Sequence, residues 1–440
     1  MQKYLFFSLI FILFGCTAPK SARNTSQFEQ LIQKNDIGKN SFVGFCLYDM
    51  QKDSYLIQYQ DDKYFTPASN IKLFTFFAGL KILGNSPETR VKGLQYSVRG
   101  DSLIFWGTGD PTLLNPRFRQ QEIFNFLQKC DKKLFFSDSN WKDQQLGEGW
   151  AWDDYSEYYS VEKSVLPIYS NLVRCEFDTS ANNFTTQPPF FQPFFEKNKN
   201  LSPQTVTRNR TDNRFFYNAP AQTVSIPFVT SGELAARLLS DTLRQSVAYL
   251  PNYPIPNDVK TVFSILADSL YKMMLPPSDN FLAEQILMLC ANQLNNRELS
   301  NKNAIEWVLK KYLSDLSQPP RWVDGSGLSR LNLVTPRSVL ELLRKIYAEV
   351  APTKEGEKRL FNLLAVGGES GTLRTLYKMQ PPFLFGKTGS LGNNHNLSGF
   401  LRSRSGRLFC FSWMNNHFIQ PTAAVKSQME KFLTDIYWKM

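Results

Sequence analysis

The chain has 440 residues and a formal net charge of +11, with 42% hydrophobic and 20% charged residues. This balance is typical of a globular protein and excludes a disordered chain, and the length allows one large core with an insertion or two to three domains. The basic residues are scattered, with no arginine-rich run, zinc-finger spacing or aromatic RNA-binding signature. A nucleic-acid-binding protein is therefore disfavoured, and we expect a solvated basic surface that tolerates nearby polyanions.

The N-terminus has the proportions of an export signal. A short positive start at Met1-Gln2-Lys3 precedes an almost wholly apolar run over residues 4–14. That run is shorter than the about 20 residues that a membrane span needs, and it ends at Gly15-Cys16, a pattern typical of a lipoprotein signal. We expect a signal peptide over residues 1–15 and a tether over 16–40, with Cys16 diacylated as the first mature residue. The alternative is an ordinary secretory signal with an incidental cysteine at position 16.

Neither disulfides nor a metal centre are expected. Apart from Cys16, the chain has five cysteines, an odd number without regular spacing. The chain has two histidines, His395 and His417, and no HExxH motif, so we predict no metal site and no cofactor.

The first elements suggest a hairpin followed by a buried helix. Residues 27–33 could form a short helix, and the apolar runs 41–50 and 54–60, joined by a polar turn, predict two paired strands. After Pro67-Ala68-Ser69 comes a segment that is apolar nearly all round as far as Leu83. Such a helix is typical of the middle of a domain.

The middle of the chain differs from both ends. Residues 91–255 contain short strand-like pieces between turns and show little helical periodicity, so we predict a mostly β insert. Helices return over 280–294, 304–316 and 338–350, followed by a strand pair over 397–402 and 407–414 and a last helix over 423–438. We predict an α+β fold in which residues 41–90 and 256–440 form one domain around the insert.

Ser69-Asn70-Ile71-Lys72 is the first candidate for chemistry. Ser139, Ser160 and Ser269 are also followed by lysine three residues later, so the spacing alone is not specific. Ser69, however, opens the buried helix, where backbone N–H groups favour developing negative charge. Burial would also hold Lys72 in its neutral form, which can accept the serine proton.

Two further motifs follow in a fixed order. Ser278-Asp279-Asn280 lies at the start of a predicted helix, and Lys387-Thr388-Gly389 precedes the strand pair. Each motif alone can be structural, as a helix cap or a surface turn. The order Ser-x-x-Lys, Ser-x-Asn, Lys-Thr-Gly is that of penicillin-binding proteins and serine β-lactamases.

Four other segments narrow this resemblance. They are Gly107-Thr108-Gly109-Asp110-Pro111, Gly149-Trp150-Ala151-Trp152-Asp153-Asp154, Asp324-Gly325-Ser326-Gly327-Leu328-Ser329 and Gly367-Gly368-Glu369-Ser370-Gly371-Thr372. With them the chain resembles the D-alanyl-D-alanine carboxypeptidase/endopeptidases, which are class C low-molecular-mass penicillin-binding proteins with extra domains between their first two catalytic motifs. The family's fold implies a transpeptidase-like domain, an antiparallel sheet flanked by helices, interrupted by the insert.

The resemblance implies roles for the motif residues. Ser69 would attack the carbonyl between the two terminal D-alanines, with Lys72 as base. Ser278 would relay the proton to the leaving amine, and Asn280 would orient Lys72 and the substrate amide.

The remaining implied roles concern substrate binding. Lys387 and Thr388 would bind the terminal carboxylate, and Gly389 would complete their motif. The backbone N–H groups of Ser69 and Ser390 would form the oxyanion hole. Lys387 would also lower the pKa of Lys72 through its charge.

A further pocket is implied by the resemblance alone. Trp150, Asp153 and Arg330 would line a site for the free end of the stem peptide's diamino acid, with a structural loop as the alternative. We interpret His395 as a loop histidine rather than a catalyst.

The expected protein is a serine carboxypeptidase/endopeptidase that acts on peptidoglycan stem peptides through an acyl-enzyme and binds penicillin covalently. We expect it at the periplasmic face of the cell envelope, held by a lipid on Cys16. A serine β-lactamase or esterase of the same fold and a catalytically dead, wall-peptide-binding scaffold remain alternatives. No dedicated deacylating carboxylate is evident in the sequence, and the intact motifs argue against a scaffold.

Overall fold

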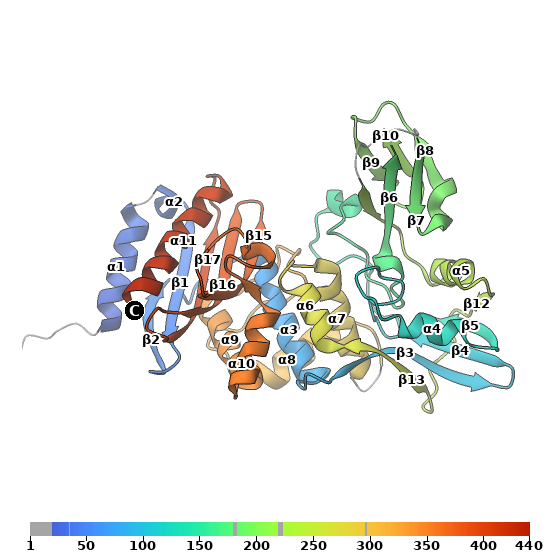
Figure 1. Ribbon diagram of the computed structural model, residues 1–440, viewed down its shortest axis with the longest axis horizontal. Helices are drawn as coiled ribbons and strands as arrows, with labels where there is room; N and C mark the ends of the chain where they lie inside the picture. The colour runs from blue at the N-terminus through green and yellow to red at the C-terminus, as the bar shows by residue number, and fades with distance from the viewer. Residues whose placement is uncertain (1–19, 35, 179–182, 219–222, 295–296) are drawn as a thin grey trace, which may run out of the picture.

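The computed structural model describes residues 20–34, 36–178, 183–218, 223–294 and 297–440. It shows a larger body of helices and sheet at one end of the molecule and a smaller, mostly β part at the other (Figure 1). Residues 1–19, which include Cys16 and the predicted signal peptide, lie outside the described residues. No helix among the described residues is both long enough and apolar enough to cross a membrane.

A six-stranded antiparallel sheet lies at the centre of the larger body. The predicted hairpin is confirmed, and its first strand pairs with a strand from the end of the chain. Along β1, Phe45 and Leu47 enter one buried cluster while Cys46 and Tyr48 enter another, so both faces of the sheet are covered. In spatial order the strands are β14 (Ala365–Val366), β15 (Leu384–Leu391), β16 (Asn394–Arg402), β17 (Leu408–Asn416), β1 (Phe42–Asp49) and β2 (Ser54–Tyr59).

Two terminal helices, α1 (Lys20–Lys34) and α11 (Thr422–Lys439), contribute to the cluster on the first face, and the short helix α2 (Asp36–Lys39) follows α1. Phe28 and Ile32, four residues apart on α1, are each 1% exposed, and the Phe28 ring lies 4.7 Å from that of Phe45. This i, i+4 apolar pair docks the helix on the sheet. Helix α1 falls within the tether expected over residues 16–40, and its Phe28 and Ile32 belong to the packed body.

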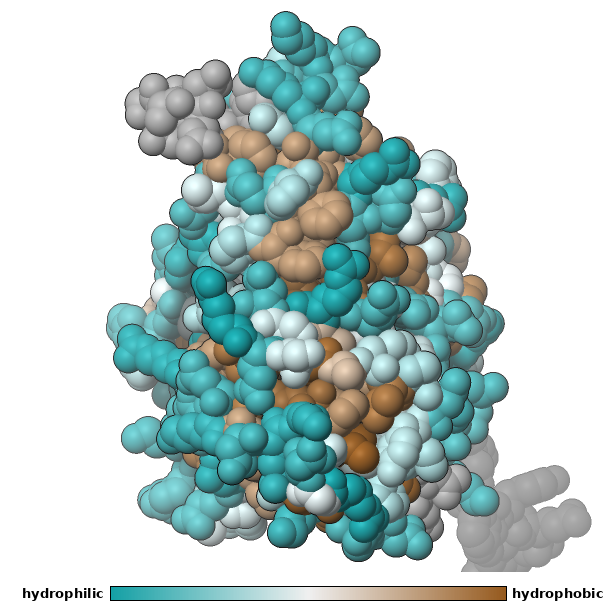
Figure 2. All heavy atoms as spheres, turned by 90° about the vertical axis from the view of Figure 1, so that its right-hand side faces the viewer, coloured by the Kyte–Doolittle hydropathy of each residue, from teal (hydrophilic) through white to brown (hydrophobic). Residues whose placement is uncertain are grey.

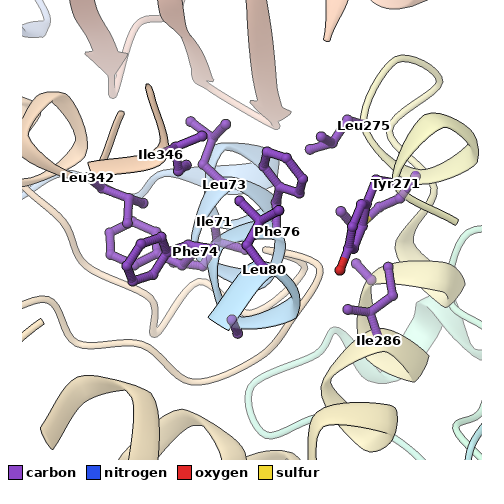
Figure 3. Close-up of a cluster of buried hydrophobic side chains, with 14 of the residues drawn as sticks. Ile71, Leu73, Phe74, Phe76, Leu80, Tyr271, Leu275, Ile286, Leu342 and Ile346 are labelled. Atoms are coloured by element: carbon purple, nitrogen blue, oxygen red, sulfur yellow. The ribbon is translucent and has the colours of Figure 1, made fainter. Parts of the chain in front are cut away.

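Further helices contribute to the cluster on the second face of the sheet, and they lie beside it in Figure 1. They are α3 (Lys72–Ile82), α6 (Ala267–Met274), α7 (Asn280–Gln293), α8 (Asn301–Tyr312), α9 (Pro336–Val350) and α10 (Lys354–Leu363). Helix α3 lies among its neighbours with Leu73, Phe74 and Phe76 directed to different sides (Figure 3). These three residues are fully buried, which confirms the predicted central helix.

The described residues of the insert form one five-stranded sheet and two three-stranded sheets. The largest has the spatial order β12 (Val247–Tyr249), β5 (Lys133–Ser137), β4 (Ser102–Gly107), β3 (Arg90–Arg99) and β13 (Lys260–Leu266). The other two are β8 (Phe195–Lys197), β10 (Phe215–Asn218) and β9 (Thr205–Arg208), and β11 (Val224–Pro227), β6 (Leu172–Asp178) and β7 (Asn183–Gln187). Strand β13 lies beyond residue 255, the predicted end of the insert.

The insert helices α4 (Glu122–Gln128) and α5 (Gly232–Leu243) were not predicted. Helix α5 buries Leu238 and Leu239 in the same cluster as Phe105 and Phe136 of the five-stranded sheet. Seen from this end, apolar areas of the surface are interrupted by hydrophilic side chains (Figure 2).

Candidate active site

Ser69 and Lys72 meet at the start of helix α3. Ser69 lies in a 3₁₀ turn (Ala68–Ile71) that leads directly into α3, and Lys72 is the first residue of that helix. The Nζ atom of Lys72 lies 2.8 Å from Ser69 Oγ, 2.7 Å from Asn280 Oδ1 and 2.5 Å from the Ser326 carbonyl oxygen. Lys72 is fully buried, so these three contacts define its surroundings.

The environment of Lys72 shifts its titration toward the neutral amine. Burial lowers the pKa of Lys72 to about 8, although the negative charges of Asp324, Asp279 and Glu284 oppose this change. A neutral amine has two N–H groups and one lone pair. If it donates to Asn280 Oδ1 and the Ser326 carbonyl, its lone pair faces Ser69 Oγ, which is the geometry of a base beside its nucleophile.

Asn280 and Ser278 come from the start of helix α7. Asp279 caps this helix by accepting a hydrogen bond from the Leu282 N–H at 2.7 Å, and Asn280 is the first helical residue. Asn280 Nδ2 donates to the Tyr159 carbonyl at 2.9 Å, which fixes the amide with its oxygen toward Lys72. Ser278 has a left-handed backbone, with φ of 65°.

Lys387 approaches from strand β15. Its Nζ atom donates to Ser278 Oγ at 2.8 Å and to the Thr388 carbonyl at 2.7 Å, and it is fully buried. Burial, and then the charge of Lys72, hold the pKa of Lys387 well below its usual range. Burial is the cause that lowers the pKa of Lys72, so the expectation that the charge of Lys387 also lowers it stays a prediction.

The rest of the Lys-Thr-Gly motif ties β15 to its neighbours. Thr388 Oγ1 donates to Thr372 Oγ1 at 2.7 Å, which connects the motif to the Gly367–Thr372 segment. A Cβ atom on Gly389 would lie 2.3 Å from the Pro67 carbonyl oxygen, so the strand can approach the Ser69 turn this closely only with glycine there.

Ser390 and His395 face each other across the β15–β16 pair. The exposed Ser390 hydroxyl lies 2.8 Å from His395 Nδ1. Burial, helped by the charges of Lys426 and Lys387, lowers the pKa of His395 to about 3. His395 is therefore a neutral, buried strand residue, and its predicted place in a loop is wrong.

The three residues of the implied second pocket are placed separately. Trp150 Nε1 donates to Asp324 Oδ2 at 2.9 Å. The exposed Arg330 directs its guanidinium at the Gly392 carbonyl, at 3.4 and 3.5 Å, beyond the end of β15. Asp153 is exposed in a 3₁₀ turn (Trp152–Ser156). The structure thus connects Trp150 to the motif at residues 324–329 and leaves the charges of Asp153 and Arg330 open to solvent.

Sequence reasoning missed the Ser326 carbonyl as a partner of Lys72. A backbone acceptor leaves no signal of its own in a sequence, although the Gly-Ser-Gly motif that contains it was noted. Asp324 holds this segment in shape: its carboxylate accepts hydrogen bonds from the N–H groups of Gly327 and Ser329 at 2.8 and 2.7 Å.

Known proteins resemble this chain over most of its length. The D-Ala-D-Ala carboxypeptidase 3 (S13) family model matches residues 24–214 and 255–436. The D-alanyl-D-alanine carboxypeptidase DacB of Haemophilus influenzae is 26% identical over 426 residues, covering 87% of this chain and 86% of that protein. A carboxypeptidase of Mycobacterium tuberculosis is 32% identical over 412 residues, covering 90% and 80%.

Solved structures share the fold. Penicillin-binding protein 4 of Haemophilus influenzae matches with a TM-score of 0.74 at 21% identity, covering 93% of this chain and 99% of that one. The peptidoglycan endopeptidase Bd3459 of Bdellovibrio bacteriovorus matches with a TM-score of 0.51 at 13% identity, covering 90% and 92%. These matches confirm the predicted α+β, penicillin-binding type of fold. With the family model covering most of the chain, the protein belongs to the D-Ala-D-Ala carboxypeptidase 3 (S13) family and is a serine-type D-Ala-D-Ala carboxypeptidase.

Proposed function

We propose that Ser69 is the nucleophile and Lys72 its base in the cleavage of the terminal D-alanyl-D-alanine bond of peptidoglycan stem peptides. The observation that carries this proposal is the 2.8 Å contact between Lys72 Nζ and Ser69 Oγ, made by a buried lysine with two further acceptors. Lys72 takes the hydroxyl proton while Ser69 Oγ forms a bond to the carbonyl carbon. The backbone N–H groups of Ser69 and Ser390 stabilise the resulting oxyanion.

The second half of acylation releases D-alanine. The C–N bond breaks, and the proton passes from Lys72 through Ser278 to the leaving amine, leaving an ester on Ser69. Water then hydrolyses this ester and restores the serine. The 2.8 Å contact between Lys387 Nζ and Ser278 Oγ supports a relay at Ser278. We assign binding of the terminal carboxylate to Lys387 and Thr388.

We assign Trp150, Asp153 and Arg330 to recognition of the diamino acid of the stem peptide. Its free end carries an ammonium and a carboxylate, and the exposed Asp153 and Arg330 offer one charge of each opposite sign. The hydrogen bond from Trp150 to Asp324 supports a connection between this region and the segment that contacts Lys72. The same site would cleave cross-links whose acyl group is a D-alanine.

The family points to the bacterial cell envelope, and the finer location stays a proposal. We assign residues 1–15 to a signal peptide and Cys16 to lipid attachment, which would hold the enzyme at the periplasmic face. β-Lactams are expected to acylate Ser69, and a solved structure of penicillin-binding protein 4 of Haemophilus influenzae contains a β-lactam.

The test of this function is acylation by a fluorescent penicillin together with D-alanine release from a pentapeptide. We expect Ser69→Ala to abolish both, because loss of a covalent nucleophile costs many orders of magnitude. Ser139→Ala, Ser160→Ala and Ser269→Ala are matched controls, since each of these serines also precedes a lysine by three residues, and all three should remain active.

The outcomes separate the competing functions. More than about a tenth of the activity left in Ser69→Ala would refute the nucleophile assignment. Rapid turnover of the penicillin, rather than a stable label, would favour a β-lactamase. Absence of any label on the unmodified protein would favour a wall-peptide-binding scaffold.

A further inference from the structure

We infer that Glu284 is a positioning residue for the base Lys72, acting through the backbone of Ser326. This inference rests on the proposed role of Lys72. Glu284 lies on helix α7, four residues after Asn280, so one face of this helix supplies both the side chain that contacts Lys72 and the side chain that holds its backbone partner.

The contacts of Glu284 join three parts of the fold. Its Oε1 atom accepts a hydrogen bond from the Ser326 N–H at 2.8 Å, and its Oε2 atom accepts one from Asn301 Nδ2 on helix α8 at 2.7 Å. Glu284 is fully buried. A buried carboxylate with both oxygens engaged has little freedom to move, so it fixes the main chain at Ser326.

The Ser326 segment is also clamped from the side of helix α3. Thr75 Oγ1 donates to the Gly325 carbonyl at 2.7 Å, and a Cβ atom on Gly327 would lie 2.0 Å from the Ala68 carbonyl oxygen. Helix α3 therefore holds Gly325 and the preceding turn touches Gly327. Glu284 contacts the same segment from helix α7, at Ser326 between these two glycines.

The contact of Glu284 with Ser326 matters because the Ser326 carbonyl determines the rotation of the Lys72 amine. The neutral amine presents its lone pair to Ser69 only while both of its N–H groups have acceptors, and these are Asn280 Oδ1 and the Ser326 carbonyl. If Ser326 turned away, the amine could rotate and donate to Ser69 Oγ instead. A misdirected base lowers the acylation rate without weakening substrate binding.

The pKa of Glu284 is set by opposing effects. Burial and the neighbouring carboxylate of Asp324 raise the pKa of Glu284 to about 7, while Lys163, which is paired with Asp143 at 2.9 Å, lowers it. The negative charge of Glu284 in turn raises the pKa of Lys72. Glu284 thus affects the base in two separable ways, by its hydrogen bond to Ser326 and by its charge.

Asn301 allows these two effects to be separated by mutation. Its Oδ1 atom is buried and has no hydrogen-bond partner among the described residues. If the Asn301 amide turned over, this oxygen could accept a hydrogen bond from a glutamine at position 284. Glu284→Gln therefore keeps the acceptor for the Ser326 N–H and removes only the charge, whereas Glu284→Ala removes both.

The experiment measures acylation of the full chain by a fluorescent penicillin between pH 5 and pH 10, separating the initial binding constant from the acylation rate constant. We expect Glu284→Ala to lower the acylation rate constant by about 30- to 100-fold with binding nearly unchanged. Glu284→Gln should stay within about threefold of the unmodified enzyme at its best pH. Its rise in rate with pH should move to lower pH, because a charge that raises the pKa of Lys72 is gone.

Glu162→Gln is the matched control. Glu162 is also a buried glutamate, but its carboxylate accepts hydrogen bonds from the N–H and hydroxyl of Thr230 instead of from Ser326. Removal of the Glu162 charge should therefore leave the pH profile of acylation in place. Unchanged acylation in a folded Glu284→Ala, or an unmoved profile in Glu284→Gln, would overturn the inference. If Glu284→Ala does not fold, the profile of Glu284→Gln decides. Failure of the unmodified enzyme to be acylated would instead refute the proposed function.

Discussion

At the scale of single residues, the site is defined by two buried lysines. Burial disfavours the charged form of both Lys72 and Lys387, and a charge on Lys72 further disfavours one on Lys387. The free site therefore favours the neutral form of both lysines more than water does. A substrate carboxylate would reverse the balance at Lys387, because a nearby negative charge favours the ammonium form there.

Lys387→Met tests this division of roles. The acylation rate of the unmodified enzyme should rise as pH increases through about 8, because neutral Lys72 is the active base and burial lowers its pKa to about 8. In Lys387→Met the rise should stay at the same pH if burial alone lowers that pKa, while affinity for a carboxylate-bearing substrate falls by about tenfold or more. The measurement is a pH profile with substrates that carry or lack the carboxylate. A profile displaced to higher pH would show that the charge of Lys387 also lowers the pKa of Lys72.

At the scale of elements, the sequence predicted those whose pattern is local. The central helix α3 and the β1–β2 hairpin follow from apolar runs and turn residues, and the three motifs could be recognised from their order. Helix α5 was missed because its apolar stripe, with Leu238 and Leu239, lies among segments of β character. The contact of Lys72 with the Ser326 carbonyl and the contact of Glu284 with the Ser326 N–H were missed, because each joins residues far apart in the chain.

Gly389→Ala tests how closely β15 must approach the turn that carries Ser69. A Cβ atom at this position would lie 2.3 Å from the Pro67 carbonyl oxygen and 2.7 Å from Asn70 Nδ2, so strand and turn must move apart. We expect the free energy of unfolding to fall by about 1–3 kcal/mol, as for other overpacked sites. Acylation should fall by more than about tenfold, since the Ser390 N–H moves away from Ser69. Denaturant unfolding and penicillin labelling measure the two effects, and unchanged labelling would contradict the close approach.

At the scale of the whole molecule, the two ends of the chain build one body. Strand β1 pairs with β17 along the full length of β1. The insert begins after α3 and ends before α7, at whose start the second motif lies. The site is thus assembled from α3, which precedes the insert in the chain, and from α7 and β15, which follow it. The family model matches residues 24–214 and 255–436, so it covers both parts of this body and much of the insert.

The position of α1 gives the predicted lipid anchor a structural consequence. Helix α1 begins at Lys20 and is docked on the sheet through Phe28 and Ile32, so a lipid on Cys16 would hold this side of the body at the membrane. In Figure 1 the insert lies at the opposite end of the molecule from α1, and it would therefore point away from the membrane.

Cys16→Ser should block lipid attachment and leave the exported protein unprocessed or soluble, because a single signal-peptide run is too short to be a stable membrane span. Membrane fractionation should show that the variant leaves the membrane fraction. Mass spectrometry of the mature N-terminus should find a lipid on Cys16 in the wild-type protein and none in the variant. Penicillin labelling of the soluble form should be unchanged, since the anchor lies outside the site. A free amine at any other residue in the unmodified mature protein would refute the anchor and leave ordinary secretion.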